Sequence, residues 1–244
     1  MQSGDDGGVT VIVSTHNPRV QAAVALRDRR ARATTGLTLV DGARECSRAL
    51  TAGVDVETAF TCPALLSGTD ADAVIEALRS RGISPTEVSD RVLETLAFGD
   101  RADGIVLVVR PPATNADAAG CTAVIAIGGT DLFNPNVIRA SVGTAFSMPL
   151  ATATAVETLA WLRGNALRIV AARVDAGLPY DNADLRGRLA IVLGSEANGL
   201  GADWDAADVE AVRLPMHGVA DSLNVSATAA ILAFEARRQR GADA

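Results

Sequence analysis

The chain has 244 residues, of which 48% are hydrophobic and 21% are charged, as in globular proteins and unlike disordered ones. Its formal net charge of −7 argues against a general nucleic-acid binder, and no apolar run is as long as a membrane span. Three cysteines without C-x-x-C spacing and only two histidines argue against a disulfide scaffold and against a metal site, and they fit a reducing cytoplasm.

Residues 1–8 are polar, acidic and glycine-rich, and they lack the basic start and apolar core of a signal peptide. We expect them to form a flexible tail. The elements expected after this tail alternate along the chain, which predicts a small α/β domain. Helices are expected at residues 19–32, 42–52, 70–80 and 91–98, and strands at residues 34–40, 56–61 and 104–110.

Pro111 and Pro112 predict a hinge, so we divide the chain into domains at residues 1–110 and 111–244. The pattern of the second domain predicts an open, mostly parallel sheet that binds ligands at the carboxyl ends of its strands. Its strands are expected at residues 123–127, 145–150, 167–171, 189–193 and 212–214, and its helices at residues 155–163 and 226–238, with a helical turn opened by Asn134.

Two strands of the second domain run into turns built from small residues. The first turn begins at Gly194, and the second follows Leu214 and leads at Asn224 into an alanine-rich helix. Small residues let a ligand approach the backbone closely, and the free N–H groups at a helix start can bind it. Together these two loops predict a cofactor site; the alternative is that they, like the turn at Gly128 and Gly129, are tight turns that require glycine.

The two turns resemble the second and third signatures of the SpoU-type (TrmH-like) RNA 2′-O-ribose methyltransferases of the SPOUT superfamily. The matching residues are Gly194, Ser195, Glu196, Gly199 and Leu200 in the second signature, and Pro215, Met216, Ser222, Leu223, Asn224, Val225 and Ser226 in the third. The resemblance implies a small L30-like α/β N-terminal domain that binds the RNA substrate, followed by an α/β SPOUT domain with a C-terminal trefoil knot. Nothing in the periodicity itself indicates a knot.

The resemblance also implies S-adenosyl-L-methionine as cofactor and a ribose 2′-hydroxyl as the attacking group. Glu196, Ser222 and Asn224 would then be catalytic. The alternatives are that Glu196 satisfies N–H groups at a helix start and that Ser222 caps the last helix. The residues implied to bind the cofactor are Gly128, Gly129, Leu193, Gly194, Ser195, Glu196, Gly199, Leu200, Leu214, Pro215, Met216, Ser222, Leu223 and Asn224.

The first signature of the family is incomplete in this chain. Only its end remains, from Asn115 to Gly120, and Thr114 stands where the family has the arginine that activates the hydroxyl. Pro111 and Pro112 are incompatible with the helix expected before it, and the preceding strand is missing. Either the sequence omits a segment of roughly 20–30 residues, judged from ordinary strand lengths, or the chain lacks it and another arginine substitutes. Arg139 is the candidate; its alternative role is a phosphate or cap contact.

All 22 basic residues are arginine, the residue that best forms paired contacts with phosphate. A GC-rich genome also explains the absence of lysine. We expect an RNA-binding cluster near the start of the first domain, while its alternative is a solvated helix face. The predicted RNA contacts are Arg27, Arg29, Arg30, Arg32 and Arg139.

The resemblance implies a cytoplasmic, homodimeric RNA 2′-O-methyltransferase that acts on ribosomal RNA, most of all 23S RNA, rather than on transfer RNA. A role in antibiotic self-resistance is compatible with the sequence. The alternative is a non-catalytic protein that binds RNA or the ribosome and keeps the fold, because the first signature is incomplete. A doubly wound nucleotide-binding enzyme is disfavoured, because the chain has neither a G-x-G-x-x-G after its first strand nor a P-loop.

Overall fold

The computed structural model describes residues 11–98, 103–112, 123–128, 131–195, 199–216 and 223–241. The predicted tail at residues 1–8 lies outside them. The chain forms two compact units, Met1–Thr152 and Ala153–Ala244. This division falls later than the predicted domain boundary after residue 110. Within the described part of the chain, no helix is long and apolar enough to cross a membrane.

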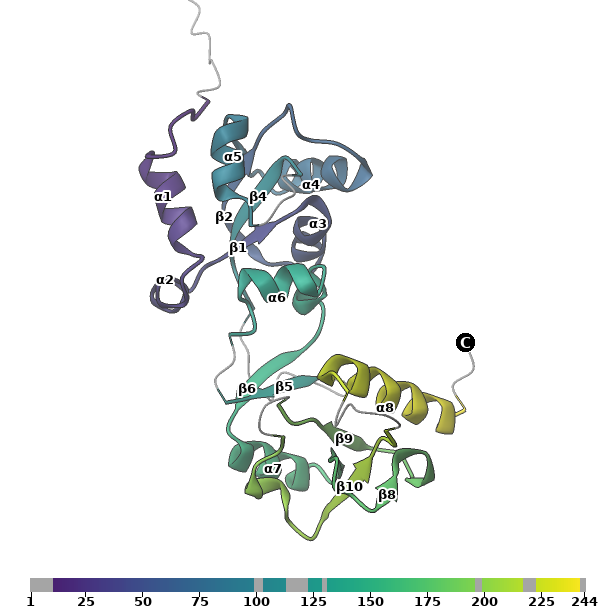
Figure 1. Ribbon diagram of the computed structural model, residues 1–244. Helices are drawn as coiled ribbons and strands as arrows, with labels where there is room; N and C mark the ends of the chain where they lie inside the picture. The colour runs from purple at the N-terminus through teal and green to yellow at the C-terminus, as the bar shows by residue number, and fades with distance from the viewer. Residues whose placement is uncertain are drawn as a thin grey trace, which may run out of the picture. The chain divides into compact units, whose positions relative to one another are not determined.

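The first unit is built on a four-stranded sheet in the order β1-β4-β2-β3 (Figure 1). Its strands are β1 (Thr38–Asp41), β4 (Ile105–Arg110), β2 (Asp55–Thr61) and β3 (Thr86–Glu87). The central strand β4 pairs antiparallel with both β1 and β2, and β2 pairs parallel with β3. The strands β1, β2 and β4 overlap the predicted strands, whereas β3, which precedes the helix predicted at residues 91–98, was not predicted.

Successive residues of β4 enter two different cores, because side chains alternate across a strand. Ile105, Leu107 and Val109 pack in one core with α3 (Ala43–Thr51) and α4 (Thr69–Ser80). Val106 and Val108 pack in the other core with α1 (Pro18–Ala25) and α5 (Asp90–Leu96). Helices therefore cover both faces of the sheet, with α1 and α5 on one side and α3 and α4 on the other (Figure 1). This confirms the predicted α/β first domain.

The helix predicted at residues 19–32 is two helices, α1 and α2 (Arg29–Thr35). The chain breaks because Asp28 caps α2, and its carboxylate accepts hydrogen bonds from the N–H groups of Arg30 and Ala31. Gly36 then ends α2 in the left-handed conformation, with φ of 67°. The strand predicted from residue 34 therefore begins only at Thr38.

Residues after the predicted hinge pack with the first unit. Phe133, Ile138 and Phe146 join the core formed by α3 and α4, and the rings of Phe133 and Phe146 stack with their centroids 5.6 Å apart. The segment forms α6 (Pro135–Ala140) and the 3-10 helix η2 (Thr144–Phe146). The strand predicted at residues 145–150 was wrong: η2 occupies its start, and the strand β6 (Leu150–Ala153) begins where that prediction ended.

Arg32 links this segment to α2 and is buried. Its Nε and Nη2 donate hydrogen bonds to Asp131 Oδ2 over 3.0 and 2.5 Å. Its Nη1 donates to the carbonyl oxygens of Leu26 and Arg27, each over 2.7 Å. A buried guanidinium is tolerated because its donors are paired and hydrogen-bonded in this way.

The second unit has a parallel sheet in the order β8-β10-β7-β9. Its strands are β8 (Leu178–Pro179), β10 (Val209–Arg213), β7 (Arg168–Ala172) and β9 (Leu189–Val192). One face packs against α7 (Ala155–Gly164) and the other against α8 (Val225–Gln239). β5 (Val124–Ile127) and β6 pair in a separate two-stranded sheet.

The parallel strands of the second unit confirm the predicted sheet, and the carboxyl ends of β7, β9 and β10 meet at one edge of it. Two further 3-10 helices, η3 (Tyr180–Asn182) and η4 (Ala202–Trp204), lie in the connections. The trefoil knot stays a prediction, because residues 217–222 of the segment expected to form it lie outside the described ranges.

Candidate functional site

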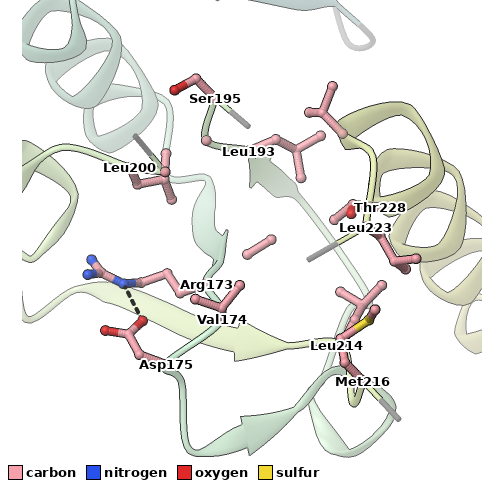
Figure 2. Close-up of a pocket in the computed structure, with 14 residues that line it drawn as sticks. Arg173, Val174, Asp175, Leu193, Ser195, Leu200, Leu214, Met216, Leu223 and Thr228 are labelled. Atoms are coloured by element: carbon pink, nitrogen blue, oxygen red, sulfur yellow. Dashed lines mark hydrogen bonds and ion pairs between the residues drawn. The ribbon is translucent and has the colours of Figure 1, made fainter. Parts of the chain in front are cut away.

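A cavity of about 330 Å³ lies at the carboxyl ends of β7, β9 and β10 (Figure 2). Its volume is at the lower end of the range usual for small-molecule sites. The walls are mostly apolar, and they come from the loops after these three strands and from the start of α8. The lining residues are Ala172, Arg173, Val174, Asp175, Leu193, Gly194, Ser195, Gly199, Leu200, Leu214, Met216, Leu223, Val225 and Thr228.

The loop after β9 is closed by two backbone hydrogen bonds. Ser195 N–H donates to the Gly199 carbonyl over 3.1 Å, and Gly199 N–H donates to the Ser195 carbonyl over 2.8 Å. Gly194 lies so close to the backbone of Gly199 that a Cβ on Gly194 would be 2.4 Å from the carbonyl carbon of Gly199. Gly199 itself has φ of 62°. Both glycines are therefore required by the backbone path that forms this wall.

The wall after β10 leads into α8. Leu214, Met216 and Leu223 face the cavity (Figure 2). Asn224 is the N-cap of α8, and its Oδ1 accepts a hydrogen bond from Ser226 N–H over 2.8 Å. The N-cap of α8 is thus Asn224, while Ser222, the residue for which we considered this role, lies outside the described residues.

The structure brings most of the predicted cofactor residues together. Leu193, Gly194, Ser195, Gly199, Leu200, Leu214, Met216 and Leu223 line the one cavity, with Pro215 and Asn224 beside them in the chain. Gly129, Glu196 and Ser222 lie outside the described residues. Gly128 follows β5 in the first unit, with φ of 88°, and is not among the described residues that line the cavity.

Sequence reasoning missed the loop after β7, which supplies Arg173, Val174 and Asp175 to the cavity. Arg173 Nε donates to Asp175 Oδ1 over 3.2 Å (Figure 2), and its Nη1 donates to Asp205 Oδ1. The hydrogen bond from Arg173 holds the pKa of Asp175 below its usual value. This loop could have been predicted to line the site, because ligands of parallel sheets bind at the carboxyl ends of the strands and a strand was predicted at residues 167–171.

Arg139, the proposed substitute for the missing arginine, lies on α6 in the first unit. Its Nη1 donates to Asp41 Oδ2 over 2.9 Å and to the carbonyl oxygen of Phe98. The Asp41 side chain is only 5% exposed, and its Oδ1 has no described partner. The guanidinium therefore stabilises a buried carboxylate. Its predicted roles in catalysis and RNA binding stay predictions.

Asp41 gives the stability of this protein a defined pH dependence. Burial raises the pKa of Asp41 above its usual 3.8, against the lowering effects of the Phe98 N–H and Arg139. A raised folded-state pKa means that the folded protein binds more protons, so the free energy of unfolding falls as pH rises through that pKa. We expect the stability difference between wild type and Asp41→Asn to shift in favour of the variant as pH rises above 3.8.

Urea denaturation of both proteins between acidic and neutral pH measures this difference. A difference that does not change with pH, or that grows in favour of the wild type, would contradict the assignment. Arg139→Ala is the matched control, because removing the cation leaves the carboxylate buried and should strengthen the pH dependence.

Two arginines of the predicted RNA-binding cluster, Arg27 and Arg32, make hydrogen bonds within the first unit. Arg27 Nη2 donates to the carbonyl oxygens of Thr95 and Ala97 over 2.8 and 2.5 Å, and its guanidinium lies over the Phe98 ring. Arg32 is buried with its donors engaged, so it cannot reach a phosphate unless the first unit opens. Arg29 and Arg30 are exposed on α2. No group of three or more His, Cys, Asp or Glu in the described ranges could hold a metal ion.

A parallel α/β sheet with one cavity at its strand ends is the architecture of a ligand-binding or catalytic α/β domain. Residues 113–234 match the sequence profile of the SpoU rRNA Methylase family, and residues 17–107 match that of the MRM3-like substrate binding domain. The first match spans half of the chain, which therefore belongs to the SpoU rRNA methylase family.

Among curated relatives, a 23S rRNA (adenosine(1067)-2′-O)-methyltransferase of Streptomyces laurentii is 38% identical over 115 residues, which are 47% of this chain and 42% of that protein. The 23S rRNA (guanosine(2553)-2′-O)-methyltransferase RlmP of Bacillus subtilis is 33% identical over 127 residues, which are 50% of each chain. The chain thus spans about half the length of the curated relatives it matches.

Solved structures cover more of the chain. A crystal structure described as an RNA 2′-O ribose methyltransferase is 36% identical, with a TM-score of 0.80 over 94% of this chain and 99% of that one. An AdoMet-bound rRNA methyltransferase from Sinorhizobium meliloti is 25% identical, with a TM-score of 0.79 over 94% of this chain and 97% of that one. The likeness covers both units and confirms the predicted two-domain α/β fold with a SpoU domain.

Proposed function

We propose that this protein transfers a methyl group from S-adenosyl-L-methionine to a ribose 2′-hydroxyl of ribosomal RNA, with 23S RNA as the substrate. One observation carries the proposal: residues of the second and third signatures, which are apart in the sequence, line a single cavity at the strand ends. The two curated relatives named above are 23S rRNA 2′-O-methyltransferases, and the Sinorhizobium meliloti structure holds AdoMet. The match of residues 17–107 to a substrate-binding domain supports an RNA substrate.

The cavity suits the proposed cofactor. Leu200, Leu214 and Leu223 offer apolar walls for a flat heterocycle, and the loop after β9 offers main-chain groups near Gly194. When bound, S-adenosylmethionine supplies a methyl group on a sulfonium, which is ready for transfer to a nucleophile. The protein must hold that nucleophile in line and assist removal of its proton.

Asn224 is the described residue best placed for a catalytic role. Its Oδ1 is used in capping α8, which fixes the side chain and leaves its two amide N–H groups as donors. We propose that this amide orients the ribose hydroxyl at the mouth of the cavity beside Leu223 and Val225. Glu196 and Ser222 are proposed to act with it.

Binding of the cofactor is the simplest test. S-adenosylmethionine titrated into the chain by isothermal calorimetry should saturate one site per chain. If no binding is seen, the cavity does not bind this cofactor, and the proposed methyl transfer is contradicted. The alternative function, a non-catalytic protein that binds RNA or the ribosome, is favoured by the incomplete first signature before Asn115. That alternative predicts RNA binding without methyl transfer.

Arg29 and Arg30 are proposed to contact the RNA backbone from α2. Reversing both charges with Arg29→Glu and Arg30→Glu is expected to weaken RNA binding and to reduce the slope of log affinity against log salt by roughly two, about one per phosphate contact. Filter binding over a series of salt concentrations measures the slope. Arg44→Glu with Arg79→Glu, which changes two exposed arginines on α3 and α4, is the matched control. An equal loss in both double variants would remove α2 from the RNA surface.

We also propose a cytoplasmic homodimer. The exposed side of α8 carries Ala227, Ala230 and Ala233 together with Phe234, whose side chain is 69% exposed. Small residues beside one large apolar side chain suit close packing of helices. Sedimentation velocity at micromolar concentration tests this, and a monomer would contradict it.

A further inference from the structure

Arg173 joins two walls of the cavity that are far apart in the sequence. It follows β7, and its N–H donates to the Val212 carbonyl of β10 over 2.9 Å. Its guanidinium lies at the cavity wall between two carboxylates, Asp175 on its own loop and Asp205 on another (Figure 2 shows the contact with Asp175). The side chain is 25% exposed, so it is held at the wall and does not extend freely into solvent.

The backbone of Asp205 is held in place by its neighbours in the chain. It directly follows η4, and its N–H donates to the Ala202 carbonyl over 3.0 Å. Trp204 beside it is buried in the core with α7. The same segment begins at Leu200, which lines the cavity. The hydrogen bond to Asp205 therefore connects the loop after β7 to a segment whose Trp204 is buried and whose Leu200 lines the cavity.

The loop after β7 has little packing of its own. Val174 is 71% exposed, and the side chain of Asp175 is 68% exposed, although both residues line the cavity. Ala176, which follows them, is buried, so the weakly packed part of the loop is residues 174–175, and a segment with so few buried apolar contacts opens easily. The Arg173 guanidinium ties this loop to the segment at residues 200–205 through its hydrogen bond to Asp205.

We propose that Arg173 is a positioning residue: by bridging Asp175 and Asp205 it holds residues 173–175 against the Leu200–Asp205 segment and keeps the cavity in its binding-competent width. This rests on the proposed function, because the ligand of the cavity is taken to be S-adenosylmethionine. A guanidinium is needed because its planar fork presents separate N–H donors to two carboxylates at once. Exposed ion pairs add little to overall stability, so the effect should be seen in ligand affinity.

Arg173→Ala should raise the Kd and the KM for S-adenosylmethionine about threefold to tenfold, because the open loop lowers the fraction of molecules competent to bind. Both kcat and Tm should stay close to wild type. Asp205→Ala should have a similar effect, and the double variant should be no worse than Arg173→Ala alone, because both single variants remove the contact between Arg173 and Asp205. Arg163→Ala, which breaks the exposed pair between Arg163 on α7 and Asp208 before β10, is the matched control and should bind normally.

Hydrogen exchange of the peptide at residues 173–177, measured without ligand, separates this proposal from the proposed function. Faster exchange in Arg173→Ala but not in Arg163→Ala supports the bridge, even if wild type binds no S-adenosylmethionine. Unchanged exchange in Arg173→Ala overturns it. So does a fall in kcat with an unchanged Kd, or a loss of affinity in the double variant that equals the sum of the two single losses.

Discussion

Gly194→Ala is expected to weaken S-adenosylmethionine binding by roughly 10- to 100-fold, the equivalent of the 1–3 kcal/mol that overpacking costs. The added Cβ would lie 2.4 Å from the Gly199 carbonyl carbon and 2.7 Å from the Leu200 nitrogen. Both neighbours are backbone atoms, so they cannot move aside as a flexible side chain would. The loop closed between Ser195 and Gly199 would have to shift, and this loop is one wall of the cavity.

Isothermal calorimetry measures the affinity, and far-UV circular dichroism checks that the sheet remains. Gly201→Ala is the matched control, because Gly201 has an ordinary φ of −72° and nothing lies within 4 Å of an added Cβ. It should bind as wild type does. Equal affinity in Gly194→Ala and wild type would show that the loop after β9 does not contact the cofactor.

Substitution of Asn224 is expected to abolish methyl transfer without removing the cofactor site. The side chain has two separable functions, since its Oδ1 caps α8 and its amide N–H groups are proposed to orient the hydroxyl. Asn224→Asp keeps the acceptor and loses the N–H groups. Asn224→Ala loses both and should also lower the free energy of unfolding by about 1 kcal/mol, the usual value of an N-cap.

Transfer should fall at least about 100-fold in both variants, as is usual when a hydrogen-bond donor that positions the reacting group is lost. Single-turnover transfer of labelled methyl, with urea denaturation in parallel, makes the comparison. Asn224→Asp with normal stability and normal transfer would limit this residue to capping. A loss confined to Asn224→Ala would point to the same conclusion, because only that variant weakens the helix.

Local patterns of the sequence predicted most of the fold. The strand β4 is apolar up to Arg110 and β7 is apolar after Arg168, and helices such as α4 have apolar residues at helical spacing, so each was predicted to within a few residues. The split between α1 and α2 was missed because it depends on Asp28 acting as a cap inside an otherwise helical segment. The strand expected at residues 145–150 was wrong because Phe146 is buried against Phe133 in the first unit.

The cavity was predicted from the second and third signatures, since the residues themselves lie next to the turns that form it. Contacts between distant residues could not be predicted in this way. Arg32 pairs with Asp131, and Arg173 with Asp205, and no local periodicity relates such partners. For this reason the arginine cluster was interpreted as a surface, although Arg27 and Arg32 are used inside the fold.

Methyl transfer to RNA tests the central claim most directly. Labelled S-adenosylmethionine is incubated with the chain and unmodified ribosomal RNA, and the product is digested to nucleosides to locate the label. We expect label on a ribose 2′-oxygen of 23S RNA, and none after substitution of Asn224. Cofactor binding without transfer to any ribosomal RNA would contradict the claim, and would favour a protein that binds RNA with the fold of the family but without its chemistry.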